Sequence, residues 1–241
     1  MSQQDNKDMA KHFYRASAAD FKKIPGSPVA YWASPKIISC FDGKKISELG
    51  KLGKGSDTGN NNLFIRHWAE VSLTDICFDA VSISDSVDSK KKYFPTHKAG
   101  GYQKWYGLRE WVVNWFNDGE VVKNSGRCNI RNKDYYFSEC ITWGKITSGT
   151  FSVRYVPSGS IADDASPSAF LASMNKKALG FMNSKTASEL LAIISPTLNF
   201  QVGDVSKLPF VDCIDSSKVD ELIFISKKHY DEQEISWEFT R

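Results

Sequence analysis

The pattern of apolar and polar residues changes about two thirds of the way along the chain. Before about residue 165, short apolar runs alternate with clusters of glycine, asparagine and proline, which is typical of strands joined by turns. In the range 151–156, apolar residues alternate with Ser152 and Arg154. This period of two predicts a half-buried strand that ends at Pro157. We expect further strand at 64–68, 76–78, 135–137 and 141–143.

A β-hairpin is predicted near the middle of the chain. The run from Trp111 to Phe116 is rich in residues that favour strands, and Asn117-Asp118-Gly119 follows it as a turn sequence. Glu120 to Lys123 would then form the returning strand.

After about Ala165, apolar residues recur at the three- and four-residue spacing of helices. One predicted helix has its apolar face between Phe170 and Met182, and a second has it between Ala187 and Ile194. A last helix is expected from about Ser217 to Tyr230. Near the start of the chain, Ser34 and Pro35 suit the cap and first turn of a short helix that Gly43 ends.

These patterns predict an α+β fold with a mixed, mainly antiparallel twisted sheet and with helices concentrated in the C-terminal third. We expect residues 1–19 to be a polar leader or the end of a preceding domain. Residues 20–212 would form the main domain, and residues 213–241 an acidic connector helix. The composition, 41% hydrophobic and 24% charged in 241 residues, suits such a core.

Basic residues gather in the middle of the chain. The net charge is only +3, but from Lys90 to Arg131 there are nine basic and three acidic residues, so this segment carries +6 and the remainder −3. A basic segment within a near-neutral chain is typical of a surface that faces DNA. The alternative is a solvated loop region with surplus lysine.

The range 100–107 combines three glycines with aromatic residues and a lysine. Interior glycines disfavour a helix, so we expect a loop that presents Tyr102, Lys104, Trp105 and Tyr106. Phosphates would suit the lysine, and the faces of bases would suit the aromatic rings. The alternative for the rings, as for Trp111 and Trp115, is core packing.

A second loop, at 58–62, is rich in asparagine. Asparagine amides can pair with adenine edges, and small hydroxyl groups contact phosphates. The alternative is an ordinary turn. The loop is not a phosphate-binding P-loop, because the Gly-Lys-Ser/Thr ending of that motif is missing.

Residues that would carry out chemistry are sparse. The four histidines are scattered, and His97 suggests a loop histidine or a phosphate contact. Asp163 and Asp164 suggest a solvated turn. The five cysteines form no C-x-x-C pair, so neither a zinc site nor a disulfide framework is expected. The polar N-terminus is no signal peptide, and the absence of a long apolar run predicts a cytoplasmic protein without a membrane span.

Several segments together resemble a known family. Thr58 to Arg66 resembles the opening of target-recognition domains in DNA restriction and modification proteins, and Ala178 to Lys185 resembles a segment that ends such domains. Four segments resemble the C-terminal region of the PglX-type adenine-specific DNA methyltransferases of BREX phage-defence systems: 21–32, 64–78, 98–119 and 180–210.

This resemblance implies a sequence-specific duplex-DNA recognition module of a phage-defence N6-adenine methyltransferase system. Enzymes of the family also carry a catalytic domain with an S-adenosylmethionine loop and an Asn-Pro-Pro-Tyr/Phe motif, and neither is found in this sequence. We therefore expect no methylation by this chain alone and no cofactor in it, since S-adenosylmethionine would bind the missing domain. The expected partners are double-stranded DNA and a methyltransferase domain or other defence-system proteins.

The alternatives are a stand-alone specificity-like or inhibitory subunit that contacts a separate methyltransferase, and an enzyme of unrecognised type such as a nuclease. For the DNA-recognition function, we assign phosphate contacts to Arg66, Lys90, Lys91, Lys92, Lys98 and Lys104. Contacts to base edges or faces are assigned to Thr58, Asn60, Asn61, Tyr102, Gln103 and Trp105. In the parent enzyme, the target adenine would flip into the catalytic domain.

Overall fold

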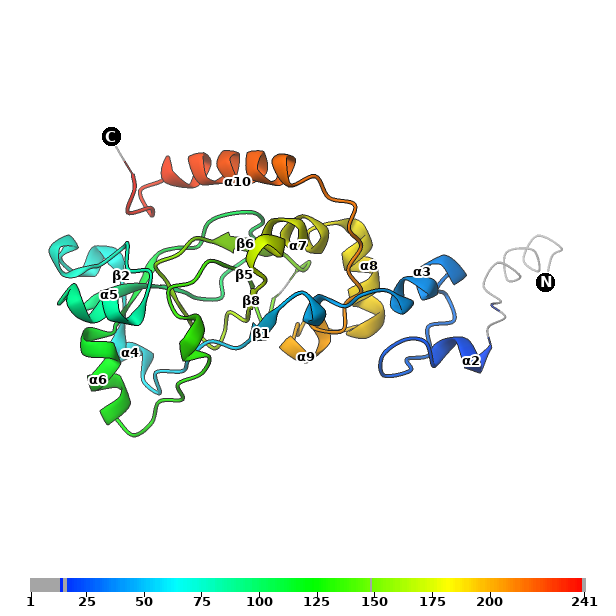
Figure 1. Cartoon of the computed structure of the whole chain (residues 1–241), viewed down its shortest axis with the longest axis horizontal. Coiled ribbons are helices and arrows are strands. Elements are labelled where there is room, and N and C mark those ends of the chain that lie inside the picture. The colour runs from blue at the N-terminus through cyan, green and yellow to red at the C-terminus, as the bar shows by residue number, and fades with distance from the viewer. Residues whose placement is uncertain (1–13, 15–16, 148, 240–241) are drawn as a thin grey trace, which may run out of the picture.

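The computed structural model describes residues 14, 17–147 and 149–239 (Figure 1). Two four-stranded sheets form the centre of the molecule. The first has the order β1-β8-β5-β6, and the second has the order β2-β4-β3-β7. All pairs are antiparallel except β3 and β7. The prediction of a mixed, mainly antiparallel α+β fold is therefore confirmed, with two sheets in place of one.

The strands are short and come from distant parts of the chain. The first sheet is built from β1 (Lys51–Gly53), β5 (Cys140–Trp143), β6 (Val153–Val156) and β8 (Ser168–Phe170). The second is built from β2 (Ile65–His67), β3 (Tyr93–His97), β4 (Trp111–Asn114) and β7 (Ile161–Ala162).

The two longest helices described lie in the C-terminal third, as predicted. They are α8 (Lys185–Ile194) and α10 (Ser216–Asp231). The others are α2 (Ala18–Phe21), α3 (Pro35–Ser39), α4 (Asn61–Phe64), α5 (Ile83–Asp88), α6 (Phe116–Asn124), α7 (Asn175–Met182) and α9 (Val202–Val205). Single 3₁₀ turns occur at Cys40–Asp42, Ile46–Glu48, Trp68–Glu70, Leu73–Asp75, Lys133–Tyr135 and Ala172–Met174.

Local capping explains where two predicted helices begin. The hydroxyl of Ser34 accepts the N–H of Ile37 ahead of α3, and the hydroxyl of Ser184 accepts the N–H of Ala187 ahead of α8. Such caps satisfy N–H groups that have no partner within the helix. The helix predicted from Phe170 begins later, at Asn175, because 168–170 pairs with β1 and β5 as strand β8.

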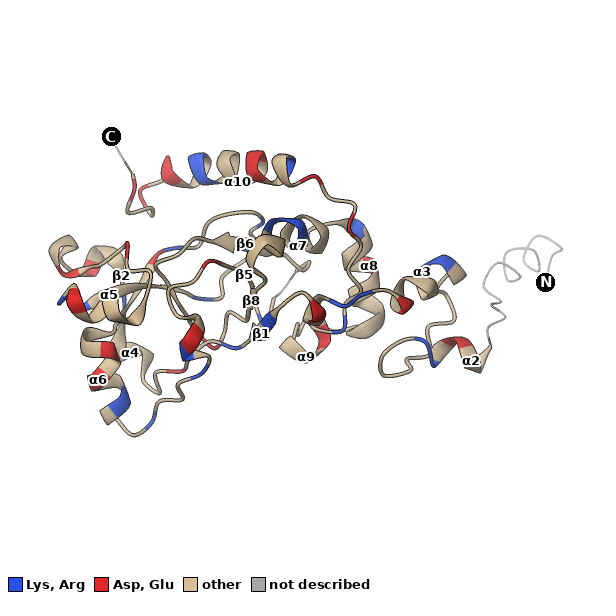
Figure 2. Ribbon diagram, viewed as in Figure 1, with Lys and Arg blue, Asp and Glu red and all other residues tan. Residues whose placement is uncertain are grey.

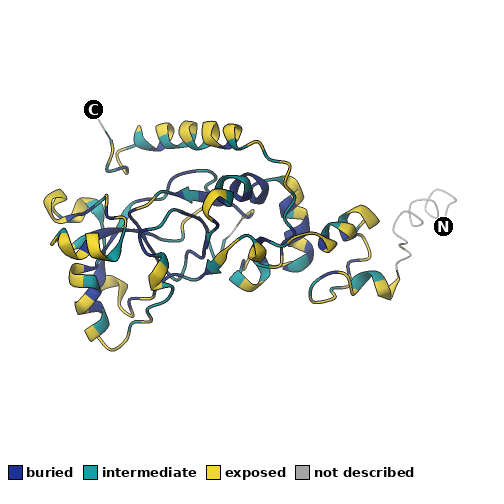
Figure 3. Cartoon of the chain, in the orientation of Figure 1, coloured by how far each residue is buried: buried dark blue, intermediate teal, exposed yellow. Residues whose placement is uncertain are grey.

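Each sheet has its own apolar core. Figure 3 shows that the helices α7 and α8 are buried on the sides that face the core. The first core packs α7 and α8 around Trp143 and Phe151, and the second surrounds Phe94, Trp115 and Phe137. The C-terminal segment spans both sheets. Tyr230 of α10 lies 5.9 Å from Tyr106 between ring centroids, and the main-chain oxygen of Ile235 accepts the indole N–H of Trp68 at 2.8 Å.

The proposed domain division stays a prediction. Of the expected leader at 1–19, residues 1–13, 15 and 16 lie outside the described residues, and Ala18 begins α2. Figure 2 shows acidic and basic residues interspersed along the ribbon, including α10. Within the described ranges, no helix combines the length and the hydrophobicity needed to cross a membrane.

The predicted hairpin at 111–123 is wrong. β4 forms as expected, but the returning segment is helix α6. Both edges of β4 are already paired, with β2 on one side and β3 on the other, so no edge remains for a hairpin partner. Asn117, Asp118 and Gly119 instead adopt three consecutive left-handed conformations that turn the chain into α6.

The strand predicted at 76–78 is only an isolated bridge between Ile76 and Tyr93, and two other strand predictions also need correction. The segment 135–137 is not a strand: Lys133–Tyr135 forms a 3₁₀ turn and Phe137 has a left-handed φ of 64°. In β6, the period of two suggested an exposed Arg154, but this side chain is only 1% exposed. The sheet is covered on both faces, so the alternation does not separate core from solvent.

We predict that Gly119→Ala destabilises the protein more than Gly126→Ala. Both glycines have positive φ, 73° and 70°, so each alanine costs about 1–2 kcal/mol of backbone strain. A Cβ at Gly119 would also lie 2.8 Å from the ring of Trp115, whereas a Cβ at Gly126 would meet no atom within 4 Å. In urea unfolding, Gly119→Ala should therefore lower the free energy of unfolding by about 1–3 kcal/mol more than Gly126→Ala does. Equal losses for the two variants would contradict the packing of α6 against Trp115.

Candidate nucleic-acid interface

The asparagine-rich loop is held by its own side chains. Thr58 is buried, and its hydroxyl donates to Oδ1 of Asn61 at 2.8 Å. Asn60 caps α4 by accepting the N–H of Leu63 at 3.2 Å. Gly59 has a φ of 71°, and a Cβ there would lie 2.5 Å from the main-chain oxygen of Arg127. Thr58 and Asn60 are therefore used to shape the loop, while Asn61 is exposed and has its amide NH₂ available for a ligand.

Three of the predicted site residues meet in one pocket of about 430 Å³, which we call the Trp111 pocket. The pairing of β2 and β3 on either side of β4 places His67 and Thr96 opposite Trp111. This register brings α4, β2 and the end of β3 together. The residues lining the pocket are Asn61, Asn62, Ile65, Arg66, Glu70, Lys98 and Trp111.

The polar groups of the Trp111 pocket are fixed by neighbouring backbone. One terminal nitrogen of Arg66 donates to the main-chain oxygens of Asn62 at 2.5 Å and Ile65 at 2.8 Å. Glu70 accepts the N–H of His67 at 2.9 Å through Oε2. The ammonium of Lys98 lies 5.6 Å from the centroid of a ring of Trp111. The pocket thus combines a guanidinium, an ammonium, a carboxylate, amides and an aromatic face.

The lysines at 90–92 lie at the other end of β3 and line a separate pocket of about 580 Å³. Lys90 and Lys92 are exposed, and the ammonium of Lys91 donates to the main-chain oxygen of Thr74 at 2.5 Å. Asp75, Asn114, Phe116 and Val121 also line this pocket. The five residues of β3 separate Lys92 from Lys98, and the six steps along this extended chain span about 20 Å at roughly 3.3 Å per residue.

The range 100–107 is a loop, as predicted, but much of it is structural. Trp105 donates its N–H to Val153 at 3.0 Å and accepts that of Tyr155 at 2.7 Å, which extends the first sheet beyond β6. The side chain of Gln103 donates to the main-chain oxygen of Tyr106 at 2.8 Å. The alternative of a packing role therefore describes Gln103 and Trp105 better than base contact.

Tyr102 and Lys104 lie in a third place. They line a pocket with Asn183 and Lys185 at the junction of α7 and α8. The ammonium of Lys104 donates to the main-chain oxygen of Asn183 at 2.8 Å, while Tyr102 is 55% exposed. Eight of the predicted site residues are thus divided among three separate pockets, and Thr58, Asn60, Gln103 and Trp105 line none of them.

Several basic residues of the middle segment are already engaged. Arg109 is buried, Lys123 pairs with Asp118 at 2.7 Å, and Arg131 pairs with Asp164 at 2.5 Å. The positive charge left for a ligand is therefore smaller than the sequence suggested. Arg127, which sequence reasoning did not single out, is exposed next to Gly59.

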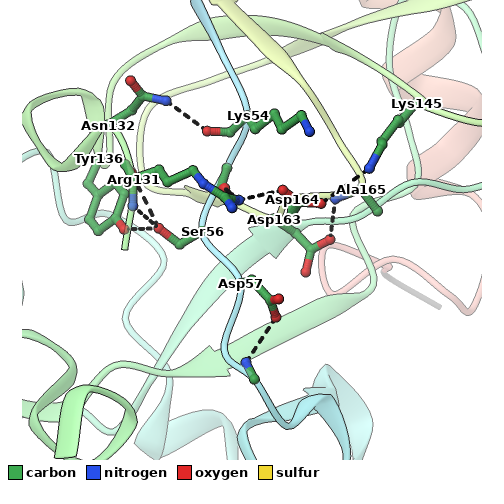
Figure 4. Close-up of polar contacts among 12 residues, drawn as sticks. Lys54, Ser56, Asp57, Arg131, Asn132, Tyr136, Lys145, Asp163, Asp164 and Ala165 are labelled. Carbon is green, nitrogen blue, oxygen red and sulfur yellow. Dashed lines mark hydrogen bonds and ion pairs between the residues drawn. The ribbon is translucent and has the colours of Figure 1, made fainter. Parts of the chain in front are cut away.

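Asp163 and Asp164 belong to a polar junction and not to a solvated turn (Figure 4). Asp163 is buried and accepts the N–H of Ala165 at 2.9 Å, and its burial raises its pKa. Asp164 accepts from Arg131 and lies 3.5 Å from the ammonium of Lys145. Nearby, the hydroxyl of Ser56 accepts the N–H of Arg131 at 2.9 Å and shares a hydrogen bond with the hydroxyl of Tyr136. These contacts connect the segment after β1 to the segments before β5 and after β7.

A buried polar cluster lies behind Lys98. His97 is a buried residue of β3 and not the loop histidine or phosphate contact that the sequence suggested, and its Nε2 lies 3.0 Å from the hydroxyl of Ser168. Arg154 donates to the main-chain oxygen of Lys98 at 3.3 Å. Burial, with Arg154 and Arg109 nearby, lowers the pKa of His97 to about 3, and burial lowers the pKa of Arg154 to about 10. Within the described ranges, the second terminal nitrogen of Arg154 and Nδ1 of His97 have no hydrogen-bond partner.

The chain is similar to part of two known proteins. No protein-family model matches it. It is 36% identical over 243 residues to the adenine-specific methyltransferase PglX of Lacticaseibacillus casei (strain Zhang), an alignment that covers 95% of this chain and 20% of PglX. It is 40% identical over 233 residues to the adenine-specific methyltransferase BrxX of Escherichia coli O9:H4 (strain HS), covering 92% of this chain and 18% of BrxX. The chain matches a part of a BREX-type PglX-like protein.

This match confirms the family resemblance seen in the sequence. The chain spans about a fifth of the length of PglX and of BrxX. In the part of the chain that the structure describes, no group of three or more histidine, cysteine, aspartate or glutamate residues is arranged to hold a metal ion.

We predict that His97 makes the protein less stable in mild acid. His97 is neutral when folded but has a pKa of 6.5 when unfolded, so the stability present above pH 6.5 is lost as the pH falls toward 3. The expected slope is at most about 1.4 kcal/mol per pH unit. Urea unfolding from pH 7.5 to 4.5 should give a shallower decline for His97→Gln than for the unchanged protein. If the free energy of unfolding declined equally with falling pH in both proteins, the result would contradict a neutral, buried His97.

We also predict that Arg154→Met does not destabilise the fold. Arg154 is fully buried and has a single hydrogen bond among the described residues, so methionine removes an uncompensated charge and keeps the volume. Arg154→Ala should instead cost about 2–5 kcal/mol, because it leaves a cavity. Thermal and urea unfolding would measure both. A loss above about 2 kcal/mol for Arg154→Met would mean that the guanidinium has a stabilising partner.

Proposed function

We propose that this chain recognises duplex DNA for a PglX-type N6-adenine methyltransferase of a phage-defence system and does not itself transfer a methyl group. The observation that carries the proposal is the Trp111 pocket. Asn61, Arg66 and Lys98 were each selected from the sequence as DNA contacts, although up to 37 positions separate them, and the fold brings all three to one pocket. The names of PglX and BrxX, adenine-specific methyltransferases, support a role beside such chemistry.

The groups in the Trp111 pocket suit the edges of bases. Arginine donates to guanine, asparagine pairs with adenine, and a carboxylate accepts the amino group of cytosine. Arg66 uses one terminal nitrogen for the main chain and keeps its other donors for a ligand. Asn61 keeps its amide NH₂, and Glu70 lies in the same pocket. We assign base recognition to these three side chains.

Cations at both ends of β3 suit the DNA backbone. Lys98 lies at the Trp111 pocket, and Lys90 to Lys92 lie about 20 Å away along the strand. With a rise of about 3.4 Å per base pair, this distance corresponds to about six base pairs. We assign phosphate contacts to Lys98 and to the exposed Lys90 and Lys92, so that one duplex would contact both ends of the second sheet.

The test of DNA recognition is retention of random duplexes by the purified chain at two salt concentrations, followed by sequencing of the retained DNA. We expect one short motif to be enriched. Asn61→Ala should reduce discrimination by about 1–3 kcal/mol at one position of that motif. Lys98→Ala should weaken all duplexes and reduce the slope of log K against log salt by about 0.9.

Lys218→Ala is the matched control, because Lys218 is an exposed lysine on α10, away from both pockets. It should leave affinity and salt slope unchanged. Equal effects of Lys98→Ala and Lys218→Ala would reject the Trp111 pocket as the contact surface. No retention at either salt concentration would reject DNA recognition and favour a subunit that acts by contact with a separate methyltransferase.

A further inference from the structure

Three aromatic side chains near the start of the described chain form an exposed group, which we call the aromatic surface. They are Tyr14, Tyr31 and Trp32, and between 50% and 54% of each is exposed. The rings of Tyr14 and Tyr31 lie 5.3 Å apart, and those of Tyr31 and Trp32 lie 5.1 Å apart in an edge-to-face arrangement. A contiguous aromatic group on the outside of a protein marks an interaction site more often than scattered single residues do.

A groove of about 330 Å³ continues the aromatic surface between α3 and α8. Trp32, Ala33, Ser34 and Ile37 line one side, and Glu189, Ala192 and Ile193 line the other. Both walls are anchored in the first core, through buried Ile38 and Phe41 on one side and buried Leu190 and Leu191 on the other. The groove is therefore a preformed, mainly apolar site with one carboxylate.

The aromatic surface and the Trp111 pocket lie at opposite ends of the molecule. Figure 1 shows α2 and α3 at one end of the long axis and α4, α5 and α6 at the other. A protein bound at the aromatic surface would leave the Trp111 pocket accessible. DNA is a poor occupant for the groove, because Glu189 would repel phosphates and the remaining groups are mostly apolar.

We propose that the aromatic surface and its groove dock the catalytic part of a PglX-type methyltransferase. About four fifths of PglX and of BrxX lies outside the segment that this chain matches, so a large further part of such a protein is available as the occupant. Aromatic residues are enriched in the cores of such interfaces. We expect the partner to place apolar side chains in the groove and a lysine or arginine against Glu189. The proposal rests on the match to PglX and not on DNA binding.

The test uses the full 241-residue chain and the part of the Lacticaseibacillus casei PglX that lies outside the matched segment, in a preparation that binds S-adenosylmethionine and is therefore folded. Isothermal titration calorimetry measures their affinity. We expect binding that weakens at least tenfold for the double variant Tyr31→Ser, Trp32→Ser. Ala192→Arg fills the groove from the exposed side of α8 and should weaken the binding of the PglX part to a similar degree. It serves as the test variant if the double variant folds poorly.

Phe224→Ser is the matched control, since Phe224 is 68% exposed on α10, and it should bind as the unchanged chain does. Retention of DNA should be unaltered in all three variants, which separates this proposal from the previous one. No binding by the unchanged chain, or equal weakening by Phe224→Ser, would overturn the proposal. So would a dimer of this chain that the Tyr31 and Trp32 substitutions dissolve, because a second copy would then be the occupant.

Discussion

Strand β4 is hydrogen-bonded on both sides, and the candidate interface depends on this pairing. The antiparallel register sets Trp111 opposite His67 of β2 and Thr96 of β3. Without it, Arg66, Lys98 and Trp111 would belong to three unrelated segments. The same double pairing leaves no free edge on β4, which is why the chain leaves the strand through a left-handed turn and enters α6.

The other constraint is the burial of positive charge between the sheets. Arg154 reaches the main-chain oxygen of Lys98 from β6, and His97 reaches Ser168 from β3, so the two sheets are connected by polar contacts as well as by apolar packing. Burial of a cation without a carboxylate is costly, and a network of this kind serves position better than stability. Here the position it fixes is that of Lys98, at the edge of the Trp111 pocket.

Local signals allowed some of this structure to be predicted. Ser34 with Pro35 predicted a helix start, because such a cap acts within three residues, and the apolar spacing from Ala187 to Ile194 predicted α8. The turn sequence Asn117-Asp118-Gly119 was also recognised, but a turn does not reveal whether the preceding strand has a free edge. The period of two in β6 identified a strand, yet it could not tell that the face bearing Arg154 is covered. Asn61, Arg66 and Lys98 could be suspected singly, while their meeting depends on strand pairing over dozens of residues. Trp111 and Glu70 were missed as site residues for that reason.

The C-terminal segment has a mechanical consequence. α10 begins over α7 beside the first sheet, and the chain after it reaches Trp68 beside the second. Between these points, the hydroxyl of Tyr230 accepts the N–H of Arg109 at 3.0 Å, and just beyond them Trp237 packs against Phe78 at 5.1 Å between ring centroids. The segment acts as a brace across the seam between the sheets. The two halves cannot pivot against each other unless this brace first detaches, so the spacing between the loop at 100–107 and the Trp111 pocket depends on a segment that belongs to neither sheet and contacts the loop through Tyr106.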